Sequence, residues 1–350
     1  MRGISLAVSL LAALMLSLPL RSHGDTYAMH ILRGGDISFG SDINDSGQIV
    51  GTTHTYGLPY TIRAVLWDSY DSDPLSLDEE NRSANGQLIN NSGLVIGKHD
   101  SPPGSTMPFK WSAGVLTDID VPFVPEAVND SGVMVGFCGG GGPPMLPVVV
   151  SRTGQLTYLN SIWGDARDIN DSGYIAGESD FNGEGYACLW HEGDEAVDIG
   201  AFGGTWSVAT GINNIGQVVG VYGGDNGAIG NFVWSLNHDT IFIPTCPLLD
   251  YGSFGPIDIN DNGVVLGTGE INGVHKVVTW SLAGGLTIVG TGDPHAINNF
   301  GYIVGTLEEF YGPGPSQAIV WEPVPEPSAF LALAGGMIGL LAGTRKRQSR

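Results

Sequence analysis

A ten-residue phrase that recurs seven times is the feature that most constrains the fold of this 350-residue chain. Each copy opens on a variable residue and continues with an apolar residue, Asn, a second Asn or Asp, another variable residue and Gly, then a short run ending in Gly. The copies begin at Asp42, Leu88, Ala127, Asp168, Gly211, Asp258 and Ala296. They lie about 42 residues apart, which is typical of units that bury their apolar faces only by stacking.

The phrase predicts a tight turn between two strands. Its Asn side chain can accept a hydrogen bond from the backbone N–H two residues on, and the first Gly stands where a type I hairpin turn needs a left-handed residue. We expect a structural role in the turn for Asn44, Asn90, Asn129, Asn170, Asn213, Asn260 and Asn298.

A tryptophan follows the turn at a similar distance in six of the seven copies. These residues are Trp67, Trp111, Trp190, Trp234, Trp280 and Trp321, and the third copy has Val150 instead. We expect them to pack in the core, because large aromatic side chains are mostly buried; stacking on a sugar is the alternative. Each tryptophan ends a short apolar run, so every unit offers about four short strands.

Four antiparallel strands in about 42 residues are typical of a propeller blade. The chain therefore predicts an all-β, seven-bladed propeller over residues 25–322. No further strand follows Trp321, so we expect the segment Tyr27 to Leu32 to complete the last blade and close the ring. An open β-solenoid is the alternative, and its terminal units should resemble caps.

Both ends of the chain carry targeting signals. Residues 1–24 combine an early positive charge with an uncharged apolar stretch, which predicts a secretory signal peptide. Near the other end, residues 323–327 precede an apolar segment, residues 328–344, that is long enough to cross a thin bilayer as a helix. A basic tail, residues 345–350, should stay cytoplasmic by the positive-inside rule. The short motif is Val324, Pro325, Glu326 and Pro327, and the basic residues are Arg345, Lys346 and Arg347.

This ending resembles the PEP-CTERM sorting signal of Gram-negative bacteria. The resemblance implies recognition by an exosortase, processing at the Pro-Glu-Pro motif while the chain is held in the inner membrane, and delivery to the cell surface or an exopolysaccharide matrix. The repeated phrase, with Phe202, Gly203 and Gly204 after it, resembles the HAF family of extracellular repeats. That second resemblance implies an extracellular location and no established activity.

Charge and motif content narrow the function classes. The formal net charge of −22 repels phosphate backbones, so we expect no nucleic-acid partner. Three cysteines, Cys138, Cys188 and Cys246, lie far apart and predict neither a zinc site nor a disulfide framework. We find no nucleophile elbow, P-loop or dinucleotide fingerprint, so the sequence does not predict an enzyme.

Two acidic patterns in the sequence could form a site. Asp258, Asn260 and Asn262 match the start of a calcium-binding loop, but Gly269 stands where the loop needs a chelating Glu. The turn explains the same residues, so we predict no cofactor and keep calcium as an alternative. The acidic runs at residues 78–80 and 308–309 could serve acid–base chemistry, although solvated loops are the simpler interpretation.

The sequence thus predicts an exported, surface-anchored repeat protein that binds a polysaccharide or another surface protein through propeller loops. One alternative is a propeller glycan hydrolase or lyase whose carboxylates converge at the central channel. Another alternative is a calcium-dependent adhesin.

Overall fold

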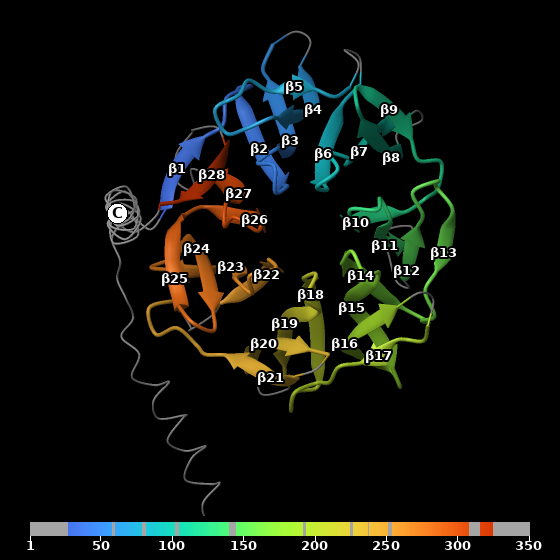
Figure 1. The fold of residues 1–350 in the computed structure, drawn as a ribbon, viewed down its shortest axis with the longest axis vertical. Coiled ribbons are helices and arrows are strands. Elements are labelled where there is room, and N and C mark those ends of the chain that lie inside the picture. Colours follow the sequence, from blue (N-terminus) through green and yellow to red (C-terminus); the bar gives the residue numbers. More distant parts are fainter. Residues whose placement is uncertain are drawn as a thin grey trace, which may run out of the picture.

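A computed structural model describes residues 27–324, apart from 58–59, 79–81, 102–104, 140–144, 192–193, 225–226, 237, 251–253 and 308–315. Its described secondary structure consists of strands, which form seven four-stranded antiparallel sheets around one axis (Figure 1). The predicted seven-bladed propeller is therefore confirmed. The predicted signal peptide, the Pro-Glu-Pro motif, the apolar segment and the basic tail lie outside the described residues. Within the described part, no helix has the length and apolarity that a membrane span requires.

Six blades consist of four consecutive strands, and the seventh combines three strands with one from the other end of the chain. Blades 1 and 2 contain β2 (Ile37–Ile43), β3 (Ile49–Thr55), β4 (Thr61–Trp67) and β5 (Leu75–Ser76), then β6 (Ala84–Ile89), β7 (Val95–Ser101), β8 (Ser105–Ser112) and β9 (Val115–Asp118). Blades 3 and 4 contain β10 (Val124–Val128), β11 (Met134–Cys138), β12 (Leu146–Val150) and β13 (Leu156–Tyr158), then β14 (Gly164–Ile169), β15 (Tyr174–Phe181), β16 (Glu184–His191) and β17 (Val197–Asp198). Blades 5 and 6 contain β18 (Trp206–Ile212), β19 (Gln217–Gly223), β20 (Ile229–Ser235) and β21 (His238–Ile243), then β22 (Gly255–Ile259), β23 (Val265–Ile271), β24 (Val274–Ser281) and β25 (Gly285–Thr291). Blade 7 contains β26 (Asp293–Ile297), β27 (Ile303–Leu307), β28 (Gln317–Pro323) and β1 (Tyr27–Ile31).

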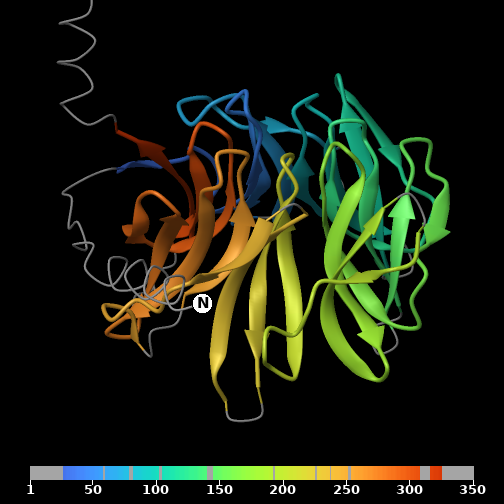
Figure 2. The ribbon, with the colours of Figure 1, turned by 60° about the horizontal axis from the view of Figure 1, so that its bottom comes forward.

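The innermost strand of every blade leads into the repeated turn. These strands, β2, β6, β10, β14, β18, β22 and β26, surround the axis (Figure 1). All seven turns consequently lie at one end of the propeller, which we call the turn face. The connections between the second and third strands of each blade lie at the opposite end, which we call the loop face (Figure 2).

The phrase also shapes the innermost strand. In every blade the pairing of the innermost strand with its neighbour shifts by one residue just before the phrase or at its start, as between Gly40 and Asp42 in blade 1. Such a bulge bends the strand and increases its twist. The closing Gly of the phrase lies against a carbonyl of that strand, so a Cβ on Gly51 would collide with the carbonyl oxygen of Phe39. The close approach explains why all seven copies end in Gly.

The apolar core lies between blades rather than within them. Each of the seven core clusters combines residues of two neighbouring blades, such as Val219 of blade 5 with Val265 of blade 6. Trp67, Trp190 and Trp321 are at most 1% exposed, which supports the core role expected for the repeated tryptophan. Stacking of this kind removes apolar surface from water only when every neighbour is present.

Strand β1 closes the ring, as the sequence predicts. It pairs antiparallel with β28, from Tyr27 opposite Pro323 to Ile31 opposite Ile319. Beside this seam, the Glu322 carboxylate accepts hydrogen bonds from the hydroxyls of Tyr302 and Tyr70 at 2.9 and 3.2 Å. Its Oε2 also lies 2.9 Å from His30 Nε2.

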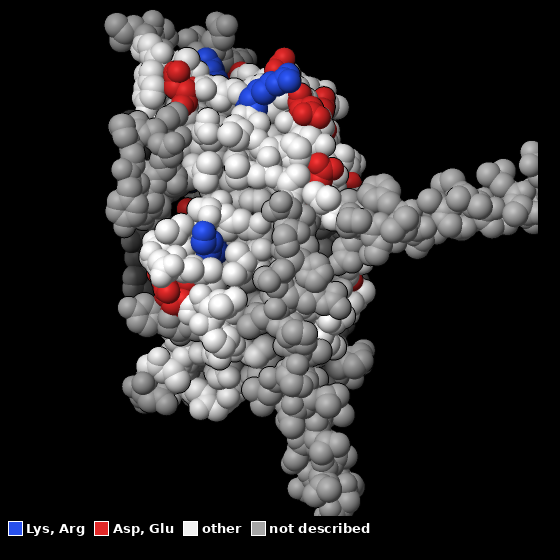
Figure 3. All heavy atoms as spheres, turned by 90° about the vertical axis from the view of Figure 1, so that its left-hand side faces the viewer, with Lys and Arg blue, Asp and Glu red and all other residues white. Residues whose placement is uncertain are grey.

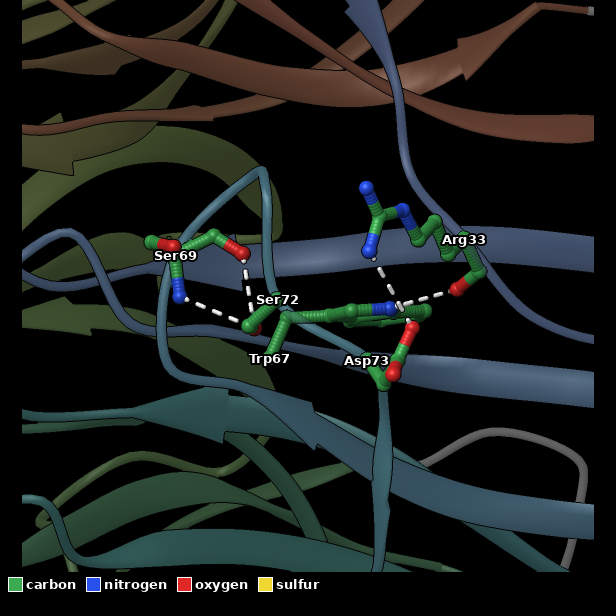
Figure 4. Close-up of polar contacts among 5 residues, drawn as sticks. All are labelled: Arg33, Trp67, Ser69, Ser72 and Asp73. Carbon is green, nitrogen blue, oxygen red and sulfur yellow. Dashed lines mark hydrogen bonds and ion pairs between the residues drawn. The ribbon is translucent and has the colours of Figure 1, made fainter.

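The residues after β1 are attached to blade 1 through a buried tryptophan. The indole N–H of Trp67 donates to the carbonyl of Arg33 at 2.7 Å, and the Arg33 guanidinium approaches Asp73 at 3.4 Å (Figure 4). Next to them, the hydroxyl of Ser72 donates to the Ser69 carbonyl and accepts its N–H (Figure 4). The closing segment is thus joined to the blades on both sides of the seam.

Candidate functional site at the axial channel

The repeated Asn is buried in every blade, and its side chain organises the turn. Each of the seven is at most 6% exposed. Its Oδ1 accepts the backbone N–H four residues on in all seven copies, as from Tyr174 to Asn170 at 3.0 Å. The expected bond from the N–H two residues on is present in four copies, those of Asn44, Asn90, Asn260 and Asn298. The turn glycines have φ between 71° and 83°, a left-handed conformation that costs glycine little.

The same Asn side chains form a closed ring around the axis, which we call the amide ring. Each Nδ2 donates to the backbone carbonyl of the Asn in the next blade, at 2.8 to 3.2 Å. The seventh bond runs from Asn298 back to Asn44 at 3.0 Å. These bonds join residues that are 38 to 254 positions apart in the chain, so the ring connects every blade to both of its neighbours.

The residues that follow the Asn form a second closed ring, which we call the outer ring. Its members are Asp45, Asn91, Asp130, Asp171, Asn214, Asp261 and Asn299. The backbone N–H of each donates to Oδ1 of the next member at 2.7 to 2.8 Å. Amide groups also bridge carboxylates, since Nδ2 of Asn299 donates to Asp45 at 3.0 Å and to Asp261 at 2.9 Å. The side chains of this ring are more exposed than the amide ring.

Three carboxylates lie beside the amide ring at the first position of the phrase. Asp42, Asp168 and Asp258 each accept two backbone N–H groups at 2.7 to 3.0 Å, one from the following residue and one from the next blade. Both rings, and Asp168 and Asp258, line an axial cavity of about 180 Å³. A cavity of this size has room for a few water molecules.

Burial shifts the acid–base behaviour of the three carboxyl groups. Removal from water raises the pKa of Asp42 and of Asp168 from 3.8 to about 7, and it outweighs the opposing effect of the two N–H bonds. The pKa of Asp258 is raised for the same reason. The negative charge of Asp258 adds to the shift at both other positions, so the three groups resist simultaneous ionisation.

This shift predicts that the propeller loses stability as the pH rises. The folded pKa lies above the unfolded one, so the stabilising contribution is complete below pH of about 4 and is lost as the pH passes about 7. We expect the free energy of unfolding to fall by a few kcal/mol, in order of magnitude, between pH 5 and pH 8. Urea unfolding at several pH values measures it. The double variant Asp42→Asn, Asp168→Asn should flatten the dependence, and an unchanged slope would contradict the assignment.

The residues predicted as a calcium alternative lie in or beside this site, but the side-chain oxygens of Asp258 and Asn260 already accept hydrogen bonds. Both carboxylate oxygens of Asp258 accept backbone N–H groups. Oδ1 of Asn260 accepts two more, and the Asn262 amide donates to the Asn299 carbonyl at 2.7 Å. Calcium needs several free oxygens around one point. These contacts favour the turn and the rings over a metal site.

Other residues singled out in the sequence are placed apart from the axis. Asp78 pairs with Arg63 at 3.0 Å, whereas its neighbours Glu79 and Glu80, and the acidic pair at 308–309, lie outside the described residues. The cysteines at 138, 188 and 246 are buried and not joined to one another. In the described ranges, no three His, Cys, Asp or Glu side chains are grouped as a metal site would need.

The outer surface carries little concentrated charge on the side formed by blades 6 and 7. Among the described residues visible there, acidic and basic side chains lie singly or in small groups between neutral residues (Figure 3).

Comparison with known proteins identifies the fold alone. No family model matches this chain, and no curated protein matches it. Among solved structures, the β-propeller domain of the Trilobed protease from Pyrococcus furiosus has a TM-score of 0.57 at 11% identity, covering 83% of this chain and 95% of that domain. That domain is described as having an open velcro topology, whereas here β1 completes blade 7.

Two further similar structures belong to larger enzymes. The acylaminoacyl peptidase of Pyrococcus horikoshii has a TM-score of 0.55 at 9% identity, over 84% of this chain and 53% of that one. A prolyl endopeptidase structure has a TM-score of 0.51 at 12% identity, over 83% and 50% respectively. This chain therefore spans about half the length of these two peptidases, and the similarity concerns the propeller fold.

Proposed function

We propose that this chain is an exported, surface-anchored propeller that binds a polysaccharide or another surface protein through its loop face. The end segments of the sequence supply the export and anchoring part of this proposal. The propeller supplies a rigid body whose seven sets of loops can carry contacts. The axial site fits a structural role, because its side chains are bonded to one another and to the backbone.

The position of the first and last residues of the propeller carries the proposal. Tyr27 and Pro323 are paired at the turn-face end of blade 7, so the chain enters and leaves the propeller at the same place. Pro323 also lies against Gly301 of a repeated turn. An anchor that begins at residue 328 would be connected by about four residues, which extend to about 14 Å at most. Until the chain is processed, such a tether would hold the turn face towards the membrane and leave the loop face pointing away from it.

The loop face offers aromatic side chains suited to sugar rings. Tyr56 and Tyr60 follow and precede strands of blade 1 at this face, are 62% and 49% exposed, and stack with ring centroids 6.0 Å apart. Trp206, at the start of the innermost strand of blade 5, is 37% exposed. Exposed aromatic faces bind the C–H faces of sugars, which makes a polysaccharide the favoured ligand class.

A second candidate is a glycan hydrolase or lyase that uses the channel carboxylates. The raised pKa values of Asp42 and Asp168 favour it, since a carboxyl group that holds its proton near pH 7 can act as a general acid. Against it, the oxygens of both groups are occupied by backbone N–H groups. Release of new reducing ends from a bound polysaccharide would favour the enzyme over the binding protein. A calcium-dependent adhesin has less support, because the side-chain oxygens of Asp258 and Asn260 already accept backbone N–H groups.

Substitution of Pro325, Glu326 and Pro327 by alanine tests the sorting proposal. We expect the variant to accumulate in the inner membrane at its unprocessed size, whereas the natural chain reaches the cell surface in a shorter form. Immunoblots of cell fractions, with surface labelling of intact cells, measure both properties. A matched control replaces Pro102, Pro103 and Gly104 by alanine and should be processed normally. Identical size and location of the sorting variant and the natural chain would refute the proposal.

A further inference from the structure

Two tryptophans lie outside the repeated set, and they occupy the same position in neighbouring blades. Trp163 directly precedes β14 of blade 4, and Trp206 begins β18 of blade 5. Counted from the bulge of each innermost strand, they lie opposite matching residues of the second strand, Asp180 and Gly223. This position holds non-aromatic residues in blades 1, 2, 3 and 7, namely Ile37, Ser83, Pro122 and Thr291. The fold therefore does not require tryptophan there.

Both indole rings lie over a glycine of their own blade at the loop face. A Cβ on Gly185 would lie 2.6 Å from Cη2 of Trp163, and a Cβ on Gly223 would lie 2.5 Å from Cζ2 of Trp206. The rings remain at the surface, because Trp206 is 37% exposed and Trp163 is partly exposed. Exposed apolar surface that the fold does not require is typical of a binding site.

A carboxylate fixes the orientation of Trp163. The indole N–H donates to Oδ2 of Asp180 at 2.9 Å, and the backbone N–H of Gly183 donates to the same oxygen at 3.0 Å. In the part of the chain that the structure describes, Oδ1 of Asp180 accepts no hydrogen bond. This oxygen can therefore accept the hydroxyl of a ligand that lies on the indole.

The charged groups around the two rings are acidic. Asp180 lies beside Trp163, and Glu184 is exposed on the hairpin that joins β15 to β16. Residues 160–164, 180–185 and 199–206 include no Lys or Arg. An anionic sugar would be repelled here, whereas the apolar face of a neutral sugar can lie flat on an indole.

We infer that blades 4 and 5 bind a neutral, β-linked polysaccharide, with one sugar ring on Trp163 and another on Trp206. A glucose-type ring has its hydroxyls at the edge and its C–H groups on both faces, so its faces suit aromatic stacking. Sheets that pack face to face lie about 10 Å apart, a distance that an extended chain of a few sugars spans. Asp180 would accept a hydroxyl of the ring that lies on Trp163.

This inference deepens the proposed binding function and rests on it only for the source of the polysaccharide. Cellopentaose is the probe, and cellobiose is the matched control, since it has the same sugar and linkage but is too short to reach both rings. Titration calorimetry uses the full-length chain in a detergent without a sugar headgroup. Cellopentaose should bind about tenfold more tightly than cellobiose, because stacking on the second ring adds to its affinity. The affinity should not change with salt concentration, because the ligand is neutral.

Variants of the two rings and of one supporting glycine complete the test. Trp206→Ala should weaken cellopentaose binding about tenfold and leave cellobiose binding unchanged, because the Trp163 side alone holds the short sugar. Trp163→Ala should weaken binding of both sugars. Gly185→Ala keeps both tryptophans but should also weaken both sugars, because the added methyl displaces the Trp163 indole. Phe300→Ala is the control, since it removes a 67% exposed ring from the turn face. Equal melting temperatures would verify that the variants fold.

Several results would overturn the inference. They are full cellopentaose affinity in either tryptophan variant, an equal loss in Phe300→Ala, equal affinities of the two sugars, tighter binding of trigalacturonate, or no cellopentaose binding. If cellopentaose did not bind but another polysaccharide or a surface protein bound through the loop face, this site would fail while the proposed function stood. If cellopentaose bound as expected but the chain never reached the cell surface, the proposed function would fail and the site would stand.

Discussion

A chain that begins after Leu32 should melt about 10 °C or more below a chain that begins at Asp25. The longer chain keeps β1 and so keeps a closed ring. The shorter chain lacks β1, whose five residues pair with β28. It also lacks Leu32, whose side chain is 3% exposed and packs in the core between blades 7 and 1. It also loses the contact of His30 with Glu322.

The loss should exceed the sum of these contacts, because the blades are mutually dependent. Each apolar cluster is shared by two blades, so loosening blade 7 exposes surface on both sides of it. The uncovered edge of β28 would also favour pairing between molecules. We therefore expect aggregation on heating, which light scattering detects alongside the circular dichroism melt.

A peptide supplies the control for this experiment. Residues 25–35, added in excess to the shorter chain, should raise its melting temperature in proportion to the logarithm of peptide concentration, because the peptide binds only the folded state. A peptide of the same composition in scrambled order should have no effect. Equal melting temperatures of the two chains would mean that pairing of β1 with β28 does not contribute to the stability of the propeller.

The parts of the fold that could be predicted from sequence are those set by local chemistry. An apolar strand end followed by Asn and Gly at fixed spacing specifies a turn through local contacts alone. Because each blade contains one such turn, the seven copies give the number of blades. The sequence also predicted a closing strand, because no strand after Trp321 could serve as the fourth strand of the last blade. Tyr27 to Ile31 occupies it.

The amide ring could not be found in the same way, because its bonds join residues of different blades. One signal was nevertheless present. A turn would accept Asp or Ser in place of Asn, yet all seven copies have Asn, the side chain that offers both an acceptor and a donor. The acceptor serves the turn and the donor reaches the next blade, as in the bond from Asn170 to the Asn213 carbonyl at 3.1 Å.

The buried carboxylates could not be recognised from the sequence either. The first residue of the phrase is Asp in three copies and Leu, Ala or Gly in the others, so it looked like tolerated variation. Its position beside the axis, and the second N–H from the next blade, exist only in the assembled ring.

Asn170→Asp should destabilise the propeller by about 3–5 kcal/mol at pH 8. The substitution keeps the oxygen that accepts the Tyr174 N–H, so the turn retains its main side-chain bond. It removes the Nδ2 donor to the Asn213 carbonyl and places a charge on a side chain that is 4% exposed. The effect therefore reports on the ring rather than on the turn. Urea unfolding followed by tryptophan fluorescence measures it.

The neighbouring residue gives a matched control with the opposite change of charge. Asp171→Asn alters the outer ring, where Asn already stands in three other blades and the side chain is exposed. It should shift stability by no more than about 0.5 kcal/mol.

Acidification should separate the ring bond from a general packing defect. Below the raised pKa of the new carboxyl group, its O–H can donate to the Asn213 carbonyl and restore the bond that the substitution removed. The deficit of Asn170→Asp should therefore be largest at high pH and shrink as the pH falls, since protonation is favoured in the folded state. A deficit below about 0.5 kcal/mol at pH 8 would show that the amide ring contributes little. A large deficit that is independent of pH would instead point to disrupted packing around the turn.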